Sequence, residues 1–262
     1  MTTIRIKTKT TGLGTPSSLQ YGELATDGNN IYFGRPDESV NQTHDLLNIS
    51  YIKTVGSGTI TPTEGASRFV FVIVGAGGGG GNAASAGTNL ASAGSCGGGG
   101  STSYMYIPQK SGDITYVVGA GGASASAGGH STVTHNGTTV TAFSGHAGNS
   151  NGSADPDEDS QLGSYNEVNT GHNGIVSTGR GSGGPGFMRV VAASYELSWA
   201  QLAGWSTYGF PSRQRGADGN NAYSGINGVG FGTGGGAAVT NTGTATTGGT
   251  GANGLIIMYE FR

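Results

Sequence analysis

Short runs of apolar and β-branched residues, separated by turn signals, predict strands rather than helices along this chain. Near the N-terminus, Ile4 and Ile6 alternate with two basic residues, and residues 31–33 (Ile-Tyr-Phe) follow an Asp-Gly-Asn-Asn turn signal. Residues 45–52 fit either one helical turn or another strand. The first 65 residues hold few large apolar side chains, so we expect this part to dock on another body.

Two longer apolar runs, residues 68–74 and 255–261, are rich in β-branched and aromatic residues and predict paired strands at one end of a second region. Residues 104–107 and 115–118 predict further strands between them. The Asn136-Gly137 pair, flanked by alternating Thr and Val residues, predicts a β-hairpin.

Glycine tracts lie between these strands. The chain has 262 residues and 54 glycines, eight in residues 1–65 and 46 afterwards, so a composition boundary falls near Gly65. The tracts have no fixed period, which excludes collagen. Val-Gly-Ala-Gly-Gly nevertheless occurs twice, beginning at Val74 and at Val118. This link between strands and tracts is not expected of a flexible linker.

We therefore expect the tracts to pack side by side as polyproline-II-like helices with three residues per turn, because such a helix leaves its backbone groups free to bond its neighbours. Flexible loops on a β-sheet scaffold are the alternative. The predicted fold is mainly irregular and β, with a small module at residues 1–65 and a glycine-rich domain at residues 66–262.

The charge and composition exclude several functions. Only 10% of the residues are charged and the formal net charge is -3, so no basic surplus favours nucleic acid. The longest apolar run, residues 69–74, is far below the roughly 20 residues that span a bilayer, and no signal peptide is recognised, so we expect no membrane insertion. The single cysteine, Cys96, excludes an internal disulfide and a CxxC metal site.

The motifs that suggest chemistry fail in context. Residues 75–80 fit the dinucleotide-binding pattern GxGxxG after a strand, but no acid follows before Asp113. The acids at 155–159 lack the glycine and glutamate of a calcium loop. The histidines at 130, 135, 146 and 172 have no partner at ligand spacing, and a Gly-x-Ser-x-Gly resemblance near residue 182 is offset. We expect no enzyme activity, catalytic residue, cofactor or metal.

Aromatic residues instead predict a binding surface. Residues 187–210 contain six aromatic residues, including both tryptophans, and aromatic side chains on loops supply large contact areas at low entropic cost. Packing of these rings within their own loop is the alternative for each. Residues 149–178 add Tyr165 and the acids Asp155, Asp157, Glu158 and Asp159, which could meet basic groups of a partner.

The order of the glycine motifs resembles that of the distal long-tail-fibre adhesins of T-even-type bacteriophages. The motifs are FVIVGAGGGGGN, CGGGGSTSYMYI, YVVGAGG, FSGHAGN, GSGGPG, GVGFGTGGG and the closing GGTGANGLIIMYEF. YGELA followed by IYFG, at residues 21–34, also resembles a segment common in phage tail-fibre and tip proteins. The resemblance spans nearly the whole chain.

The resemblance implies a virion protein at the distal tip of the long tail fibre, made in the host cytoplasm. Its N-terminal domain would attach to a trimeric fibre shaft, and a sandwich of packed polyglycine-II helices with short β-hairpins would present long variable loops to a bacterial outer-membrane protein such as a porin. That contact would determine host range. The alternative is a related fibre-assembly chaperone that is not retained in the virion.

The resemblance also implies which residues act. Recognition loops fall near residues 82–96, 123–129, 149–178, 187–215 and 237–247, and hairpins near Lys110, Asn136 and Asn220 would lie at the opposite end. The receptor-binding candidates are Asn89, Asp157, Asp159, Tyr165, Tyr195, Trp199, Trp205, Tyr208, Phe210 and Thr242. The fibre-attachment candidates are Ile4, Ile6, Leu24, Tyr32 and Phe33.

Overall fold

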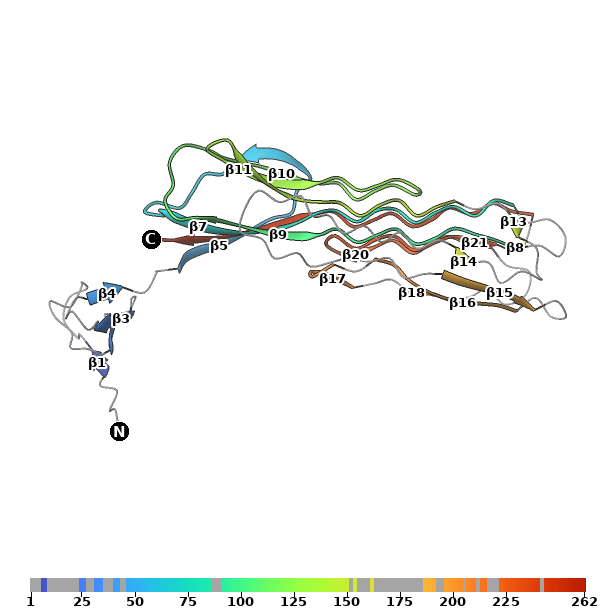
Figure 1. Cartoon of the computed structure of the whole chain (residues 1–262), viewed down its shortest axis with the longest axis horizontal. Helices are drawn as coiled ribbons and strands as arrows, with labels where there is room; N and C mark the ends of the chain where they lie inside the picture. The colour runs from blue at the N-terminus through green and yellow to red at the C-terminus, as the bar shows by residue number, and fades with distance from the viewer. Residues whose placement is uncertain are drawn as a thin grey trace.

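The computed structural model is built from strands, turns and extended glycine tracts (Figure 1). It describes residues 46–85, 92–150, 203–204, 206–210, 222–240 and 243–262 with their side chains, and further strands between residues 6–42 and 91–215 by their backbone. These residues contain no helix, as the sequence predicts.

The N-terminal strands form one four-stranded sheet in the order β1-β2-β3-β4. The strands are β1 (Ile6–Thr8), β2 (Leu24–Thr26), β3 (Ile31–Gly34) and β4 (Val40–Gln42). The strands predicted around Ile6 and at residues 31–33 are thereby confirmed, whereas Ile4 lies outside the described residues.

Two further sheets pack face to face at one end of the glycine-rich region, which we call the two-sheet end. One has the order β5-β22-β7-β9 and the other β12-β11-β10-β6. Their strands are β5 (Leu46–Ile52), β22 (Leu255–Phe261), β7 (Arg68–Val74), β9 (Thr102–Ile107), β12 (Thr138–Ala142), β11 (Ser131–His135), β10 (Ile114–Val118) and β6 (Gly56–Thr59).

The apolar runs of the sequence build the core of this end. Phe69, Phe71 and Ile73 alternate inward along β7 and are completely buried, together with Ile256 of the paired strand β22. The predicted pairing of residues 68–74 with 255–261 is confirmed. The Asn-Gly hairpin is confirmed as well, because Asn136 (φ 49) and Gly137 (φ 75) both take the left-handed conformation that a tight two-residue turn needs.

The composition boundary at Gly65 does not coincide with a boundary in strand pairing. β5 and β6 both precede Gly65, yet β5 pairs with β22 and β6 pairs with β10. Of residues 45–52, which fit a helix or a strand, Leu46–Ile52 are a strand because Ile52 and its neighbours pair with the apolar strand β22. The strands that pair with those of the glycine-rich region therefore begin at Leu46, ahead of Gly65.

The tract at residues 75–81 is surrounded by other extended segments that run beside it. Its amide hydrogens are donated to three antiparallel segments with a period of three residues, and its carbonyls accept from another three. The amides of residues 75, 78 and 81 donate to the carbonyls of residues 101, 98 and 95 on one neighbouring segment. The amides of residues 76 and 79 donate to the carbonyls of 129 and 126 on a second segment, and those of 77 and 80 donate to the carbonyls of 252 and 249 on a third. The carbonyls at 76 and 79 accept from 145 and 148, those at 77 and 80 from 122 and 125, and those at 78 and 81 from 235 and 238.

This packing leaves no room for side chains inside the array. A Cβ placed on Gly78 or Gly79 would lie 1.9 Å from the carbonyl oxygen of His146 or 1.8 Å from that of Ala123. Glycine is therefore required because neighbouring backbones touch, although each glycine loses more conformational freedom on folding than any other residue. The cross-segment hydrogen bonds satisfy the buried backbone groups. The hydrogen bonds between neighbouring tracts show the side-by-side packing that the sequence predicts.

Short strands complete the far end of the array. Sheet β13-β8-β21-β19 joins β13 (Ser153–Ala154), β8 (Ala91–Ala93), β21 (Val239–Thr240) and β19 (Ala222–Tyr223). Sheet β14-β15-β16-β18 joins β14 (Gln161–Leu162), β15 (Gly186–Val191), β16 (Glu196–Leu202) and β18 (Arg213–Arg215). A separate ribbon, nearer the two-sheet end (Figure 1), pairs β17 (Gly209–Phe210) with β20 (Val229–Gly230).

The recognition loop expected near residues 187–215 contains strands. β15 and β16 pair antiparallel over residues 188–191 and 196–199. Residues 196–199 (Glu-Leu-Ser-Trp) alternate polar and apolar side chains in the period of a strand. In Figure 1 the glycine tracts run side by side between the two-sheet end, at the left, and the labels β8, β13 and β21, at the right.

Candidate functional site

The candidate binding site is the end of the array that lies farthest from the two packed sheets, here called the distal end. It comprises sheet β13-β8-β21-β19 and the adjoining residues 82–85 and 243–247. Ala83 pairs with Thr246 through backbone hydrogen bonds of 3.0 Å in both directions, so two glycine tracts finish at the same level. The described residues of this end are Asn, Ser, Thr, Ala, Gly, Val and Tyr, with no charged side chain among them.

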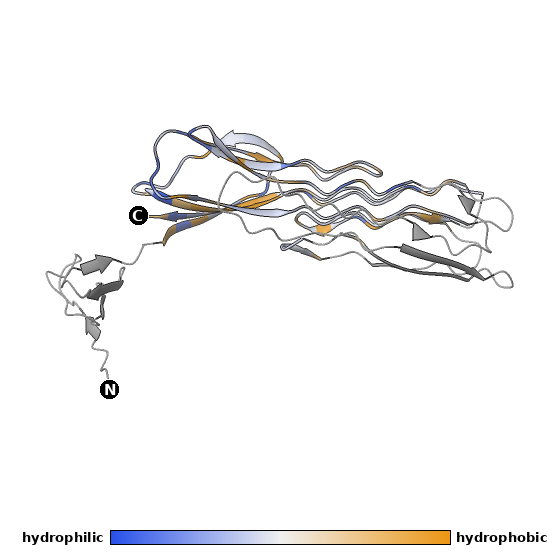
Figure 2. Ribbon diagram, viewed as in Figure 1, coloured by the Kyte–Doolittle hydropathy of each residue, from blue (hydrophilic) through white to orange (hydrophobic). Residues whose placement is uncertain are grey.

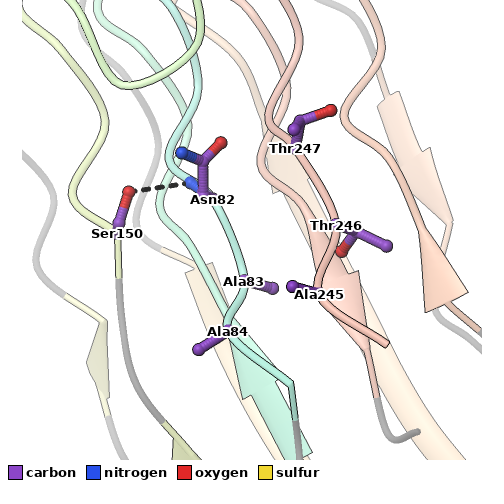
Figure 3. Close-up of a pocket in the computed structure, with 7 residues that line it drawn as sticks. All are labelled: Asn82, Ala83, Ala84, Ser150, Ala245, Thr246 and Thr247. Carbon is purple, nitrogen blue, oxygen red and sulfur yellow. Dashed lines mark hydrogen bonds between the residues drawn. The ribbon is translucent and has the colours of Figure 1, made fainter. Parts of the chain in front are cut away.

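A groove of about 450 Å³ opens at the distal end. Ala83, Ala84 and Ala245 give it an apolar lining, and Ser150, Thr246 and Thr247 add hydroxyl groups. Figure 3 shows that these residues come from three separate tracts and that Ala83 and Ala245 face one another. A shallow groove with an apolar base and hydroxyls beside it suits the contact surface of a partner.

Asn82 holds the tracts together beneath this groove. Its backbone amide donates to Ser150 Oγ at 3.0 Å (Figure 3). Its side-chain Oδ1 accepts the backbone amide of Gly248 at 3.0 Å and a short hydrogen bond from Ser124 Oγ. Three tracts are thereby joined at one residue. The sequence placed Asn82 at the start of the predicted recognition loop 82–96 but gave no sign that it joins three tracts.

Most of the predicted receptor-binding residues lie outside the described residues. These are Asn89, Asp157, Asp159, Tyr165, Tyr195, Trp205 and Thr242. Trp199 is described by its backbone alone and occupies strand β16, opposite Met188 of β15.

Tyr208 and Phe210 do not belong to the distal end, which corrects their assignment to a recognition loop. Tyr208 and Phe231 pack against a buried cluster of the two-sheet end, formed by Val72, Val74, Leu255 and Ile257. Burial raises the pKa of Tyr208 above its usual range, and the nearby phenols of other tyrosines add to the shift. Phe210 follows on β17 and is 80% exposed. The chain has already returned along the array at these positions, so aromatic content alone misplaced them.

The turns of the two-sheet end are partly as expected. Lys110 and Asn136 both lie there, since the Lys110 amide bonds the Ser67 carbonyl at 2.8 Å and Asn136 Nδ2 donates to Ser111 Oγ at 2.6 Å. Asn220 lies outside the described residues. β19, which begins at Ala222, pairs with β21 at the distal end. A further turn of the described chain lies at residues 230–232, where Gly230 (φ 88) and Gly232 (φ 72) reverse the chain beside Val74.

Two other predicted recognition loops are smaller than expected. Residues 123–126 form a tight turn, closed by a 2.9 Å hydrogen bond from the Ser126 amide to the Ala123 carbonyl. Figure 1 shows this green hairpin ending short of β8 and β13. Residues 237–240 are buried and end in β21, so only the part after Thr240 remains as a distal connection.

Three of the five attachment candidates share a register row. Ile6 pairs with Leu24 and Leu24 with Phe33, so three of them stand opposite one another across three strands. Tyr32 is the neighbour of Phe33 on β3 and pairs with Ala25.

Other chemistry is not apparent in the described part of the chain. No group of three or more His, Cys, Asp or Glu residues is placed to hold a metal ion there. No described helix is long and apolar enough to cross a membrane. Burial raises the pKa of the Cys96 thiol to about 12, while a backbone hydrogen bond with Ala237 acts in the opposite direction. His130 and His135 each accept a backbone amide, from Ser144 at 3.0 Å and Ser111 at 3.3 Å.

No protein-family model matches the chain, and no curated protein is significantly similar to it in sequence.

Proposed function

We propose that the glycine tracts form a sandwich of packed polyglycine-II helices. The period of three residues in the hydrogen bonds of residues 75–81 supports this assignment, because a polyproline-II-type helix has three residues per turn and no internal hydrogen bonds. The Cβ positions agree with it. Those of Gly77 and Gly80 point at residues 233 and 236, and those of Gly78 and Gly81 point at residues 146 and 149.

The function proposed for this scaffold is that of a phage tail-fibre tip adhesin, which binds a bacterial outer-membrane protein through its distal end and so determines host range. The observation that carries the proposal is the convergence of chain connections at one end of a tightly bonded array. Segments 86–90, 216–221 and 241–242 each adjoin one strand of sheet β13-β8-β21-β19, namely β8, β19 and β21. A scaffold with fixed backbone contacts permits variation in these connections without loss of the fold.

The distal surface chemistry supports protein recognition rather than catalysis. The groove beside Asn82 offers methyl and hydroxyl groups on a base fixed by three tracts, so little ordering entropy is lost on binding. The acids at 155–159 follow β13 in sequence and would add charge complementarity to a basic receptor loop. The N-terminal sheet, with the row Ile6, Leu24 and Phe33, would attach the chain to a trimeric shaft.

The test is binding of the purified chain, produced together with the C-terminal tip of its fibre shaft, to intact host cells. Segments 86–90, 216–221 and 241–245 are each replaced by Gly-Ser sequences of equal length, which leaves the glycine tracts intact. Deletion of residues 187–215 is unsuitable, because Gly204 packs inside the array and its amide bonds the Gly97 carbonyl at 2.9 Å. The control replaces Gln109 and Asp113, two exposed residues of the two-sheet end, by Ser.

At least one distal replacement should abolish cell binding at unchanged thermal stability, while the control binds as the parent chain does. Loss of binding on cells that lack one outer-membrane protein would name the receptor. Binding to the shaft without binding to cells, together with absence from mature particles, would replace the adhesin by an assembly chaperone.

A further inference from the structure

The outward face of sheet β5-β22-β7-β9 is an apolar surface that the function proposed above leaves unexplained. Its inward face packs against the second sheet, whereas its outward face is arranged in rows that cross all four strands. One row is Ile49, Tyr259, Val70 and Tyr106, and the next is Tyr51, Ile257, Val72 and Tyr104.

The array covers only part of this face. Tyr208 and Phe231 pack over Val72 and Ile257, which are 4% and 3% exposed. Farther from the array the cover ends, and Ile49 and Tyr106 are 40% and 46% exposed. Figure 2 shows orange, hydrophobic segments in the strands of this end, whereas the glycine tracts are mostly pale.

The open part of the face extends to a free sheet edge. β5 pairs with β22 alone among the described strands, so the backbone groups on its other side face outward. Leu46 and Tyr51 on this edge are 50% and 57% exposed. An exposed apolar edge strand is a surface on which another chain can pair, and proteins that do not use such an edge protect it.

The cations at this face indicate the chemistry of the partner. Lys53 Nζ lies 5.5 Å from the ring centroid of Tyr51, which places the ammonium group beside the exposed edge. Arg68 pairs with Phe261, at the margin of the same face. A partner surface that is apolar and carries carboxylates would fit.

The N-terminal sheet limits where that partner can be. β4 ends at Gln42 and β5 begins at Leu46, so only residues 43–45 separate the attachment module from this edge. Such a connection spans at most about 15 Å when fully extended. Whatever the N-terminal sheet binds is therefore held next to the apolar face.

We propose that this face, centred on Ile49 and Tyr106, is a second docking surface for the fibre shaft, which binds it through apolar and acidic side chains. The proposal rests on the adhesin function. Two contacts joined by a short connection would bind the shaft more tightly than either contact alone and would fix the direction of the array.

The experiment measures the affinity of the full chain for the trimeric C-terminal tip of the shaft protein from the same phage. The test variants are Ile49→Thr, Tyr106→Thr and the double variant, which keep β-forming residues on the two edge strands. The matched control is Ile226→Thr with Val229→Thr, two side chains that are 46% and 60% exposed away from this face. Thermal unfolding and cell binding of the variants are measured in parallel.

The double variant should bind the shaft at least tenfold more weakly at unchanged thermal stability, each single variant should show part of the loss, and the control should bind as the parent chain does. Equal affinity of the parent and the double variant would overturn the docking surface and leave the adhesin proposal intact. A dimer of the parent chain that the double variant loses would assign the face to a contact between copies instead. Failure of the parent chain to bind either shaft or cells would overturn the proposed function itself.

Discussion

The carbonyl oxygen of His146 occupies the space into which any side chain on Gly78 would project. A Cβ on Gly78 would lie 1.9 Å from that oxygen, and the Gly78 amide at the same time bonds the Gly98 carbonyl at 2.9 Å. The backbone at Gly78 is therefore held from two directions by segments far apart in sequence. The order of the array depends on the absence of side chains rather than on their interlocking.

Substitution of Gly78 by Ala should be strongly destabilising, because only backbone atoms surround the added methyl group. We expect a loss of about 3 kcal/mol, at the upper end of the usual overpacking range, and a fall of about 10 °C in Tm. The control is Gly243→Ala, since a Cβ on Gly243 has no atom within 4 Å. Equal Tm values of the two variants by calorimetry would contradict the close packing.

The sequence predicts much of this architecture, and its failures have physical causes. Residues 68–74 and 255–261 were recognisable as partners because continuous apolar strands must be buried together. Tyr208 and Phe210 were misplaced because tract lengths do not show where a chain reverses. Whether residues 45–52 form a helical turn or a strand was ambiguous, because the pairing of β5 with β22 joins segments nearly a whole chain apart. No local pattern encodes such a contact.

The distal groove illustrates the same limit. Asn82 could be recognised as the end of a tract, but the convergence of Asn82, Ser150 and Thr246 depends on three tracts having matched lengths. The number of residues in a tract shows where the tract ends only once the direction in which it runs is known, and the sequence does not show that direction. Chemistry at the groove was therefore not predictable from spacing along the chain.

Replacement of Glu260 by Gln should loosen the connection between β5 and the rest of the two-sheet end. The Glu260 carboxylate is 1% exposed and accepts the Thr63 amide at 2.8 Å, the Thr63 hydroxyl at 2.8 Å and Asn48 Nδ2 at 2.7 Å. An amide group in its place turns a donor toward donors, so we expect a loss of about 2 kcal/mol in denaturant unfolding. Glu64→Gln, at an exposed position, is the control and should be neutral.

Cys96 should make the protein sensitive to alkali. Its pKa is raised from 9.0 to about 12 by burial, so the unfolded chain ionises first as the pH rises. The stabilising contribution is complete below pH 9 and is lost between pH 9 and 12, at about 1.4 kcal/mol per pH unit. Cys96→Ala should unfold with a weaker pH dependence in this window. The same slope in both chains would show that the thiol does not ionise on unfolding.

The thiol should also be inert in the folded protein. Because a thiolate is the reactive form, iodoacetamide should leave Cys96 unmodified at pH 8 and modify it only in denaturant. Rapid modification of the native chain, followed by mass spectrometry, would contradict the burial of Cys96 beside Ala237.

The two ends of the array should respond differently to substitutions that affect host binding. Phe210 is exposed but follows Tyr208, which packs at the two-sheet end, so Phe210→Ala should leave binding to host cells unchanged. Ala84 is exposed and lines the distal groove, so Ala84→Glu should weaken binding at least tenfold by placing a charge in an apolar contact. Loss of binding in Phe210→Ala with full binding in Ala84→Glu would move the receptor site to the flank of the array, because both residues are exposed and neither substitution removes a buried contact.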